Sequence, residues 1–285
     1  MTFAKTILAA SFLIAALASP ALADLEWPRF RGPHGAGVAL DERSDLPLRF
    51  GPEVNVKFRI DVPPGPSSPC ISGNRIFLAA YDGEDDKGEL VALCLDRTTG
   101  EKLWRRALPV EGTIERGSRL SHPASSTPAI DATRAVFYFA AFGLVAYDLE
   151  GKELWRKPLP TPLTGHGAST SPVIEKDRVF LACDQDVGSH ILAVDARTGT
   201  TLWRTERPGF RRGFATPILW PQEEPTELIL PGTLRVVAYD LKSGAERWHA
   251  GGLPNEMVAS PTFGGGLLFC GGWTYGSGAD RLPPW

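Results

Sequence analysis

The stretch LAVDARTGTTLW, residues 192–203, decides the fold because the chain contains it four times in related form. The other copies are ALCLDRTTGEKLW at 92–104, LVAYDLEGKELW at 144–155 and VVAYDLKSGAERW at 236–248. In each copy a glycine lies four residues before a tryptophan, which gives the pairs Gly100 and Trp104, Gly151 and Trp155, Gly199 and Trp203, and Gly244 and Trp248. Self-similarity at a fixed period indicates a repeat architecture.

A second anchor, Ser or Thr followed by proline, opens each repeat. These prolines are Pro69, Pro128, Pro172, Pro217 and Pro261, and the last four are spaced by 44, 45 and 44 residues. In the third repeat, short apolar runs separated by turn residues predict four antiparallel strands. They are SPVIE at 171–175, RVFLACD at 178–184, HILAVDA at 190–196 and TTLWRT at 200–205.

Two residues, a glycine and an aspartate, explain why the last hairpin of each repeat has a tight turn. Gly199 supplies the positive φ that the turn needs, and the Asp195 carboxylate can accept hydrogen bonds from backbone amides of the same turn. The D-x-x-T-G spacing therefore predicts a tight hairpin just before the tryptophan.

A four-stranded antiparallel unit repeated at this period predicts the blades of a β-propeller. The 30 glycines and 25 prolines among 285 residues fit an all-β chain of short strands and many turns. We interpret Trp104, Trp155, Trp203 and Trp248, with their four glycines, as structural. A large ring at the same place in every blade buries apolar surface against the neighbouring blade.

The repeats resemble the A-x-D-x-x-T-G-x-x-x-W docking motif of the pyrroloquinoline-quinone-type β-propeller family. AVDARTGTTLW at 193–203 matches it fully, while Cys94 stands where Ala is usual and the copy at 144–155 is one residue shorter. The resemblance extends from Ser67 to Cys270, and WPRFRGPHGAGVA at 27–39 is similar to the start of secreted bacterial members. It implies the fold, but implies nothing about cofactor binding.

Propellers of this family usually have eight blades, which at about 44 residues each need roughly 350 residues, more than the 285 present. We expect an N-terminal extension at 24–55, and repeats at 56–285 that form four complete blades and a partial fifth. Residues 56–62, VKFRIDV, are expected to form an outer strand that normally completes the final blade. The sequence therefore predicts an incomplete part of an eight-bladed ring, truncated at its C-terminus. A genuine open half-ring is the alternative.

Residues 1–23 have the features of a signal peptide. Lys5 precedes an apolar run at 7–18, and Ala21-Leu22-Ala23 forms a cleavage site. The apolar run is too short to span a bilayer, and no later segment is long enough. We expect a periplasmic or secreted protein that begins at Asp24. A net charge of −3 makes nucleic acid an unfavourable partner.

Two classes of function remain open. The first is a non-catalytic scaffold that binds a protein or a small polar or anionic ligand. The second, implied by the resemblance, is a quinoprotein dehydrogenase that oxidises alcohols or sugars with pyrroloquinoline quinone and Ca²⁺. The family's dehydrogenases usually have adjacent cysteines, which this sequence lacks, and the acidic run at 82–89 does not match a calcium loop. We therefore predict no metal, no catalytic residue and no cofactor, with the quinone possible by resemblance only.

The four cysteines, Cys70, Cys94, Cys183 and Cys270, lie far apart in strand-like stretches. One disulfide is possible in an oxidising compartment. The alternative is that all four are small buried apolar residues.

Candidate ligand-binding residues come from the loops that enter the innermost strands. Six residues before Pro128, Pro172, Pro217 and Pro261 stand His122, His166, Arg211 and Asn255, all polar. Because equivalent loops meet at the mouth of the central funnel, we predict a site there for a polar or anionic ligand. A chance run of polar loop residues is the alternative.

Overall fold

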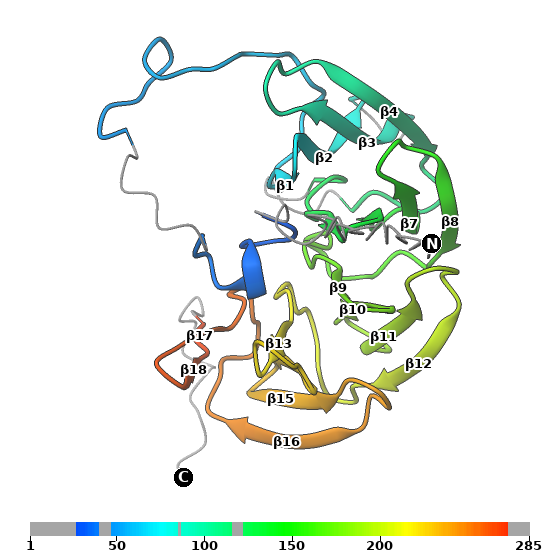
Figure 1. Cartoon of the computed structure of the whole chain (residues 1–285). Helices are drawn as coiled ribbons and strands as arrows, with labels where there is room; N and C mark the ends of the chain where they lie inside the picture. Colours follow the sequence, from blue (N-terminus) through cyan, green and yellow to red (C-terminus); the bar gives the residue numbers. More distant parts are fainter. Residues whose placement is uncertain (1–26, 40–46, 85–86, 116–121, 273–285) are drawn as a thin grey trace, which may run out of the picture.

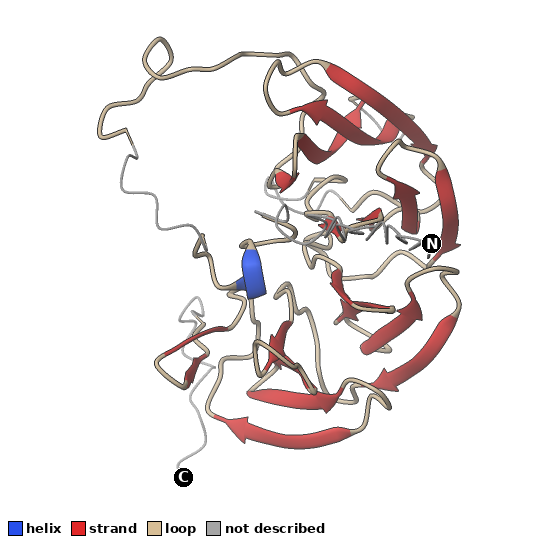
Figure 2. Cartoon of the chain, viewed as in Figure 1, coloured by secondary structure: helices blue, strands red, loops and turns tan. Residues whose placement is uncertain are grey.

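The computed structural model describes residues 27–39, 47–84, 87–115 and 122–272, and their regular secondary structure is almost entirely β-strand (Figure 2). One short 3-10 helix, η1, spans Pro33–Gly35. The first two sheets contain β1 (Cys70–Ser72), β2 (Arg75–Asp82), β3 (Glu89–Asp96) and β4 (Lys102–Pro109), then β5 (Ala129–Ile130), β6 (Arg134–Phe139), β7 (Gly143–Asp148) and β8 (Glu153–Pro158). The next two contain β9 (Val173–Glu175), β10 (Arg178–Cys183), β11 (His190–Asp195) and β12 (Thr201–Glu206), then β13 (Ile218–Trp220), β14 (Glu227–Gly232), β15 (Arg235–Asp240) and β16 (Glu246–Gly251). A two-stranded sheet of β17 (Thr262–Gly264) and β18 (Leu267–Phe269) follows.

Each four-stranded sheet is an antiparallel meander in chain order, and we call these sheets blades one to four. The blades follow one another around an arc, with the first strand of each nearest the centre and the fourth at the rim (Figure 1). This arrangement confirms the predicted all-β propeller with four-stranded blades. The described strands do not close a ring, as expected for an incomplete propeller.

The D-x-x-T-G hairpin forms as its chemistry predicts. The Asp195 carboxylate accepts hydrogen bonds from the backbone N–H groups of Arg197 and Thr198, at 2.9 Å each, and from the Thr198 hydroxyl at 3.1 Å. Gly199 has φ +71°, a conformation that favours glycine. Asp96 and Asp240 make the same turn bonds in blades one and four.

In blades two, three and four, the hairpin glycine packs on a tryptophan of the preceding blade. Trp155 Nε1 donates to the carbonyl of Ala196 at 2.9 Å, and Gly199 lies against the same indole ring. Trp104 contacts Gly151 in the same way, and Trp203 contacts Gly244. Blades one to four are therefore joined in sequence, each consecutive pair by one indole N–H bond and one close ring contact.

A small residue faces each tryptophan across the strand pair. The partners of Trp155, Trp203 and Trp248 are Ala146, Ala193 and Ala238, and the partner of Trp104 is Cys94. A β-bulge follows immediately in all four pairs, which bends the outer strand and strengthens its twist. A small side chain leaves room for the indole, so Cys94 can take the place of alanine.

Trp248 is placed differently from the other three. Its exposed fraction is 38%, against 7% for Trp155, and its Nε1 donates to Glu227 of its own blade at 3.1 Å. Among the described residues, no hairpin glycine packs on it. Trp248 therefore does not dock a following blade here.

Residues 56–62 form no strand, although the sequence predicts one. A strand needs a ladder partner, and these residues pair with no described strand. Phe58 nevertheless packs on Gly100, where an added β-carbon would lie 2.6 Å from its ring. Phe58 thus takes the place that tryptophan has before the later blades.

The Ser/Thr-Pro anchors form a chain of hydrogen bonds from blade to blade. The backbone N–H of Ser68 donates to the Thr127 hydroxyl at 3.1 Å, and the backbone N–H of Thr127 donates to the Ser171 hydroxyl at 3.0 Å. In the same way, the N–H of Ser171 donates to the Thr216 hydroxyl at 3.0 Å, and the N–H of Thr216 donates to the Ser260 hydroxyl at 2.9 Å. Each anchor hydroxyl therefore satisfies a backbone donor of the previous blade, which explains why Ser or Thr recurs there.

Residues 27–37, which belong to the predicted N-terminal extension, lie across the innermost strands. Trp27 pairs with Ile71 of β1, and the Pro28 carbonyl accepts the N–H of Ile130 in β5. Arg31 Nη1 donates to the carbonyl of Ser260 at 3.3 Å, and η1 contacts β13 near the centre of the arc (Figure 1). This segment contacts strands from several blades at once.

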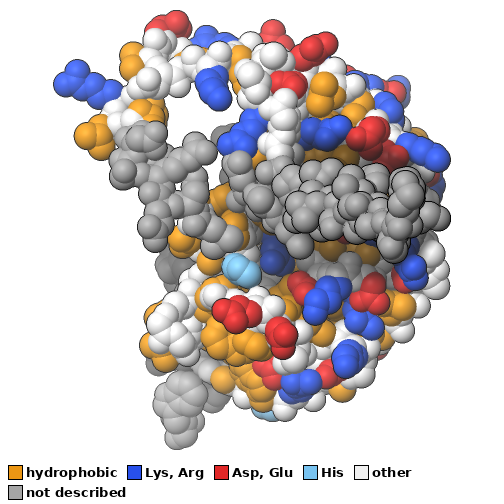
Figure 3. All heavy atoms as spheres, viewed as in Figure 1, with side chains coloured by type: hydrophobic (Ala, Val, Ile, Leu, Met, Phe, Trp, Pro, Cys, Tyr) orange, Lys and Arg blue, Asp and Glu red, His pale blue; other side chains and the backbone are white. Residues whose placement is uncertain are grey.

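Ion pairs lie along the outer strands. Arg105 pairs with Asp82 and Glu89, Arg156 with Glu153, Arg204 with Glu206, and Arg247 with Asp240. Figure 3 shows basic and acidic side chains interspersed along the rim. Exposed pairs add little stability each, but charged rim strands discourage edge-to-edge association.

All four cysteines are free thiols, so the structure contains no disulfide. Cys70, Cys94 and Cys183 are buried among apolar side chains, and Cys270 is half-buried. Burial raises the pKa of the Cys94 and Cys183 thiols to about 12, which keeps them protonated and unreactive.

Candidate interaction surface

The four predicted funnel residues lie in the connections between consecutive blades. His122 precedes β5, His166 precedes β9, Arg211 precedes β13 and Asn255 precedes β17. The structure does not bring them together as one cluster of side chains. His122 contacts Ala124 and Tyr81, whereas His166 and Arg211 lie near Asp186.

Asp186, in the hairpin between β10 and β11, is the centre of a charged group. Arg212 Nε lies 2.6 Å from its carboxylate, and Arg211 Nη2 lies 3.9 Å away. The Arg212 hydrogen bond holds the pKa of Asp186 below its usual value, and the charges of Arg211 and His166 act in the same direction. Arg212 also lies 3.7 Å from Glu256, next to Asn255. The group therefore links the hairpin of blade three to the connections that follow blades three and four.

Backbone contacts extend this group in both directions. The Asp186 N–H donates to the carbonyl of Leu163 at 2.8 Å, and the N–H of Phe214 donates to the carbonyl of Met257 at 2.8 Å. Exposed apolar side chains lie at or next to these residues, and the exposed fraction of Val187 is 81%. We call the whole set the loop strip: Leu163, His166, Asp186, Val187, Arg211, Arg212, Asn255, Glu256 and Val258.

His166 and Asn255 are exposed members of the loop strip. The His166 ring packs edge-on to Phe214 at 6.3 Å, and its backbone N–H donates to the Thr164 hydroxyl at 3.1 Å. Neither side chain is buried, so both can contact a large partner without the protein rearranging.

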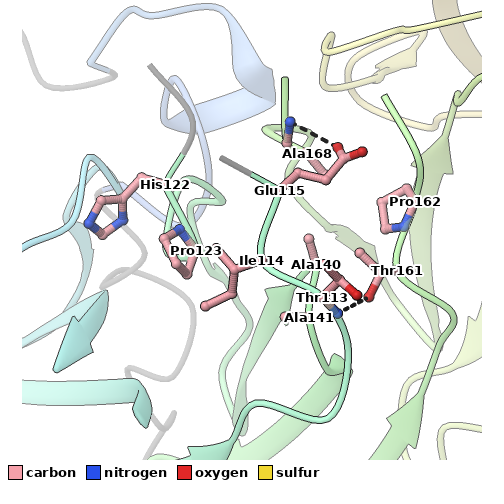
Figure 4. A pocket seen from close by; sticks show the side chains of 11 residues that line it. Thr113, Ile114, Glu115, His122, Pro123, Ala140, Ala141, Thr161, Pro162 and Ala168 are labelled. Carbon is pink, nitrogen blue, oxygen red and sulfur yellow. Dashed lines mark hydrogen bonds between the residues drawn. The ribbon is translucent and has the colours of Figure 1, made fainter. Parts of the chain in front are cut away.

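His122 lies beside a small pocket lined by Glu115, Thr161 and Ala168 (Figure 4). Its Nδ1 accepts the N–H of Ala124 at 3.1 Å, and its ring faces the edge of Tyr81. The pocket volume is about 20 Å³, which suits a single water molecule and no larger ligand.

Glu115 fixes the connection that carries His166. Its carboxylate accepts the backbone N–H groups of Thr164, Gly165 and Gly167 at 3.0 to 3.1 Å. Burial alone would raise the pKa of Glu115, but these hydrogen bonds lower it overall. Glu115 is therefore engaged in holding the loop.

Sequence reasoning did not select Asp186, Arg212 or Glu256 as candidate site residues. The prediction treated 186–189 as a plain turn, and the repeat offset selected Arg211 but not its neighbour. The paired arginines at 211–212 followed by Gly213 were the available signal. The pairing of Arg212 with Asp186 depends on how blade three meets blade four, which one sequence does not contain.

The described residues do not fit a calcium-quinone site. Among them, no group of three or more His, Cys, Asp or Glu side chains is placed to hold a metal ion. The carboxylates of Glu115 and Asp186, in the loops at this end of the blades, are already bound by backbone amides and by arginines.

The fold and the repeats define a propeller of pyrroloquinoline-quinone-type blades. The model of a family described as outer membrane protein assembly factor BamB matches residues 54–187 and 86–260. These matches cover more than half of the chain, so it belongs to that family. The resemblance seen in the sequence is thereby confirmed.

One curated relative is the outer membrane protein assembly factor BamB of Alkalilimnicola ehrlichii. It is 31% identical over 147 residues, which are 50% of this chain and 33% of the relative. The chain therefore spans about one third of the length of this relative.

Solved structures of similar fold include two quinohemoprotein alcohol dehydrogenases. The enzyme of Pseudomonas putida HK5 superposes with a TM-score of 0.54 and 15% identity, over 70% of this chain and 36% of that one. The enzyme of Comamonas testosteroni gives a TM-score of 0.50 and 14% identity, over 67% and 35%. At these identities the likeness establishes the propeller fold alone.

Proposed function

We propose that this protein is an exported, non-catalytic scaffold that binds another protein through the loop strip and assists the assembly of outer membrane proteins. The observation that carries the proposal is the row of exposed apolar side chains, Leu163, Val187 and Val258, beside Arg211. The assembly role is inferred from the matching family and the curated relative, which are both described as outer membrane protein assembly factor BamB.

The composition of the loop strip suits a protein interface. Protein interfaces combine apolar anchors and arginine with a polar rim. Full burial of a Val or Leu side chain contributes about 1.5–3 kcal/mol, so three such anchors supply a useful part of a binding free energy. The ion pairs of Asp186 hold the arginines in place before a partner arrives, which lowers the entropy lost on binding.

Export rests on the leader at 1–23, which lies outside the described residues. Within the described part of the chain, no helix has the length and apolar character needed to cross a membrane. A periplasmic location would place the loop strip where outer membrane proteins pass before insertion.

The test uses a bacterial strain that lacks the gene and is complemented with variants of the full chain. Val187→Asp places a charge at the centre of the strip and should lower the amount of folded outer membrane proteins, measured by heat-modifiable migration in gels. Val56→Asp changes another exposed valine, in the segment before blade one, and should have no effect. Equal complementation by both variants would contradict the proposal.

A photo-crosslinking amino acid at position 187 gives a direct measurement. Crosslinks to a specific periplasmic or outer membrane protein are expected from position 187 and not from position 56. Identical crosslinks from both positions would show that contact there is nonspecific.

A further inference from the structure

A cavity of about 300 Å³ lies between blades two and three, apart from the loop strip. Its polar side chains are Tyr138, Lys157, Cys183, Gln185, His190, Thr201 and Arg204. Its apolar wall consists mainly of Pro158, Leu159, Pro160, Pro162 and Leu192. No Asp or Glu of the described chain lines it. The cavity therefore combines an apolar surface with cations.

The strand register explains why polar groups reach this place. Val194, Leu192 and His190 alternate along β11 on the side that packs against blade two, so His190 continues an apolar row. Tyr138 continues the row of Val136 on the facing side of β6. The apolar interface between the blades thus ends in a phenol and an imidazole.

Tyr138 is not needed by the blade itself. It stands four residues after Arg134, and the same position holds Ala79, Ala182 and Pro231 in the other blades. Its exposed fraction is 2%, yet its hydroxyl makes no hydrogen bond within the described part of the chain. The hydroxyl oxygen is accessible from the cavity, so water or a ligand there can bond to it.

His190 offers a second unused group. Its Nδ1 lies 2.9 Å from the carbonyl of Gly188, and a carbonyl only accepts, so Nδ1 carries the proton. Burial lowers the pKa of His190, which favours the neutral ring. Its Nε2 is then a hydrogen-bond acceptor beside the cavity.

Lys157 supplies a positive charge to the cavity. Arg204 already pairs with Glu206 at 2.6 Å, whereas no carboxylate of the described chain pairs with the Lys157 ammonium group. An anion is therefore attracted to the Lys157 end of the cavity.

We propose that this cavity binds a small aromatic hydroxycarboxylate. The ligand's carboxylate pairs with Lys157, its hydroxyl donates to His190 Nε2 and accepts from Tyr138, and its ring packs on the proline-rich wall. Cavities of this size accept such small molecules, and each polar group then gains a partner.

Calorimetric titration of the full chain with 4-hydroxybenzoate tests the proposal. One-to-one binding is expected, at least about tenfold tighter than that of benzoate, which lacks the hydroxyl, or 4-hydroxybenzamide, which lacks the charge. Equal affinity for all three compounds, or no binding at millimolar ligand, would overturn it.

Variants locate the site. Lys157→Met should weaken binding about tenfold or more, while Lys152→Met, which changes an exposed lysine in the nearby β7–β8 turn, should leave it unchanged. Tyr138→Phe removes a single hydroxyl and should weaken binding about fivefold without lowering the melting temperature. Unchanged affinity in both Lys157→Met and Tyr138→Phe would overturn the assignment.

Discussion

Gly199 of blade three lies against the indole ring of Trp155 in blade two, so closely that an added β-carbon would lie 2.6 Å from the ring. This contact, together with the bond from Trp155 Nε1 to Ala196, joins the two blades. The same pairing occurs between blades one and two and between blades three and four.

Gly199→Ala should therefore destabilise the protein by about 2 kcal/mol or more, because it adds a clash with the indole ring to the strain of a positive φ. Gly209→Ala is the matched control. Gly209 has φ +82°, but nothing lies within 4 Å of an added β-carbon, so only about 1 kcal/mol should be lost. Urea unfolding measures both. Equal losses would show that the blade contact is unimportant.

Trp155→Ala should cost about 3–5 kcal/mol, since it removes a buried ring and leaves a cavity between blades. Trp248→Ala should cost less than half as much, because its ring is partly exposed and docks no described hairpin. Urea unfolding curves compare the two variants. A larger loss at Trp248 would contradict the packing described here.

Thr216→Val should cost about 1–3 kcal/mol, although it keeps the shape of the side chain. It removes the hydroxyl that accepts the buried N–H of Ser171 at 3.0 Å and leaves that donor without a partner. Thr262→Val, in a strand outside this hydrogen-bond chain, is the control and should change little. The melting temperatures should separate the two variants.

Asp240→Asn should reduce the stability of the protein at neutral pH. The Arg247 guanidinium and then Ser243 hold the pKa of Asp240 well below its ordinary value. A lowered pKa in the folded state stabilises the protein above the unfolded pKa of about 3.9, and this gain is lost as the pH falls below it.

The difference in melting temperature between the wild type and Asp240→Asn should therefore be largest near pH 7 and shrink below about pH 4. Asp61→Asn, an exposed substitution in the segment before blade one, should show no such trend. A difference that stays constant down to pH 2 would argue against the pairing.

The blades could be predicted from the sequence because their determinants are local. The Asp195 hairpin, the glycine with positive φ and the alternation along each strand all depend on residues close in the chain. The spacing of the Ser/Thr-Pro anchors then predicts the β-propeller fold.

Other features depend on contacts between distant segments and could not be predicted. Residues 56–62 have the pattern of a strand, but a strand forms only beside a free edge. Arg212 was missed for the same reason, since its partner Asp186 belongs to a different connection. His122 was grouped with Arg211 by spacing alone, yet it bonds within its own loop.

The segment at 27–37 has a consequence for the order of folding. Arg31 bonds to Ser260, a residue 229 positions later, so this contact forms only after most of the chain has been synthesised. Blades, by contrast, are built from neighbouring strands and can form as the chain emerges. Residues 27–37, although they come early in the chain, are thus among the last to reach their final positions. Until then the inner strand edges that they cover are available to chaperones and to other chains.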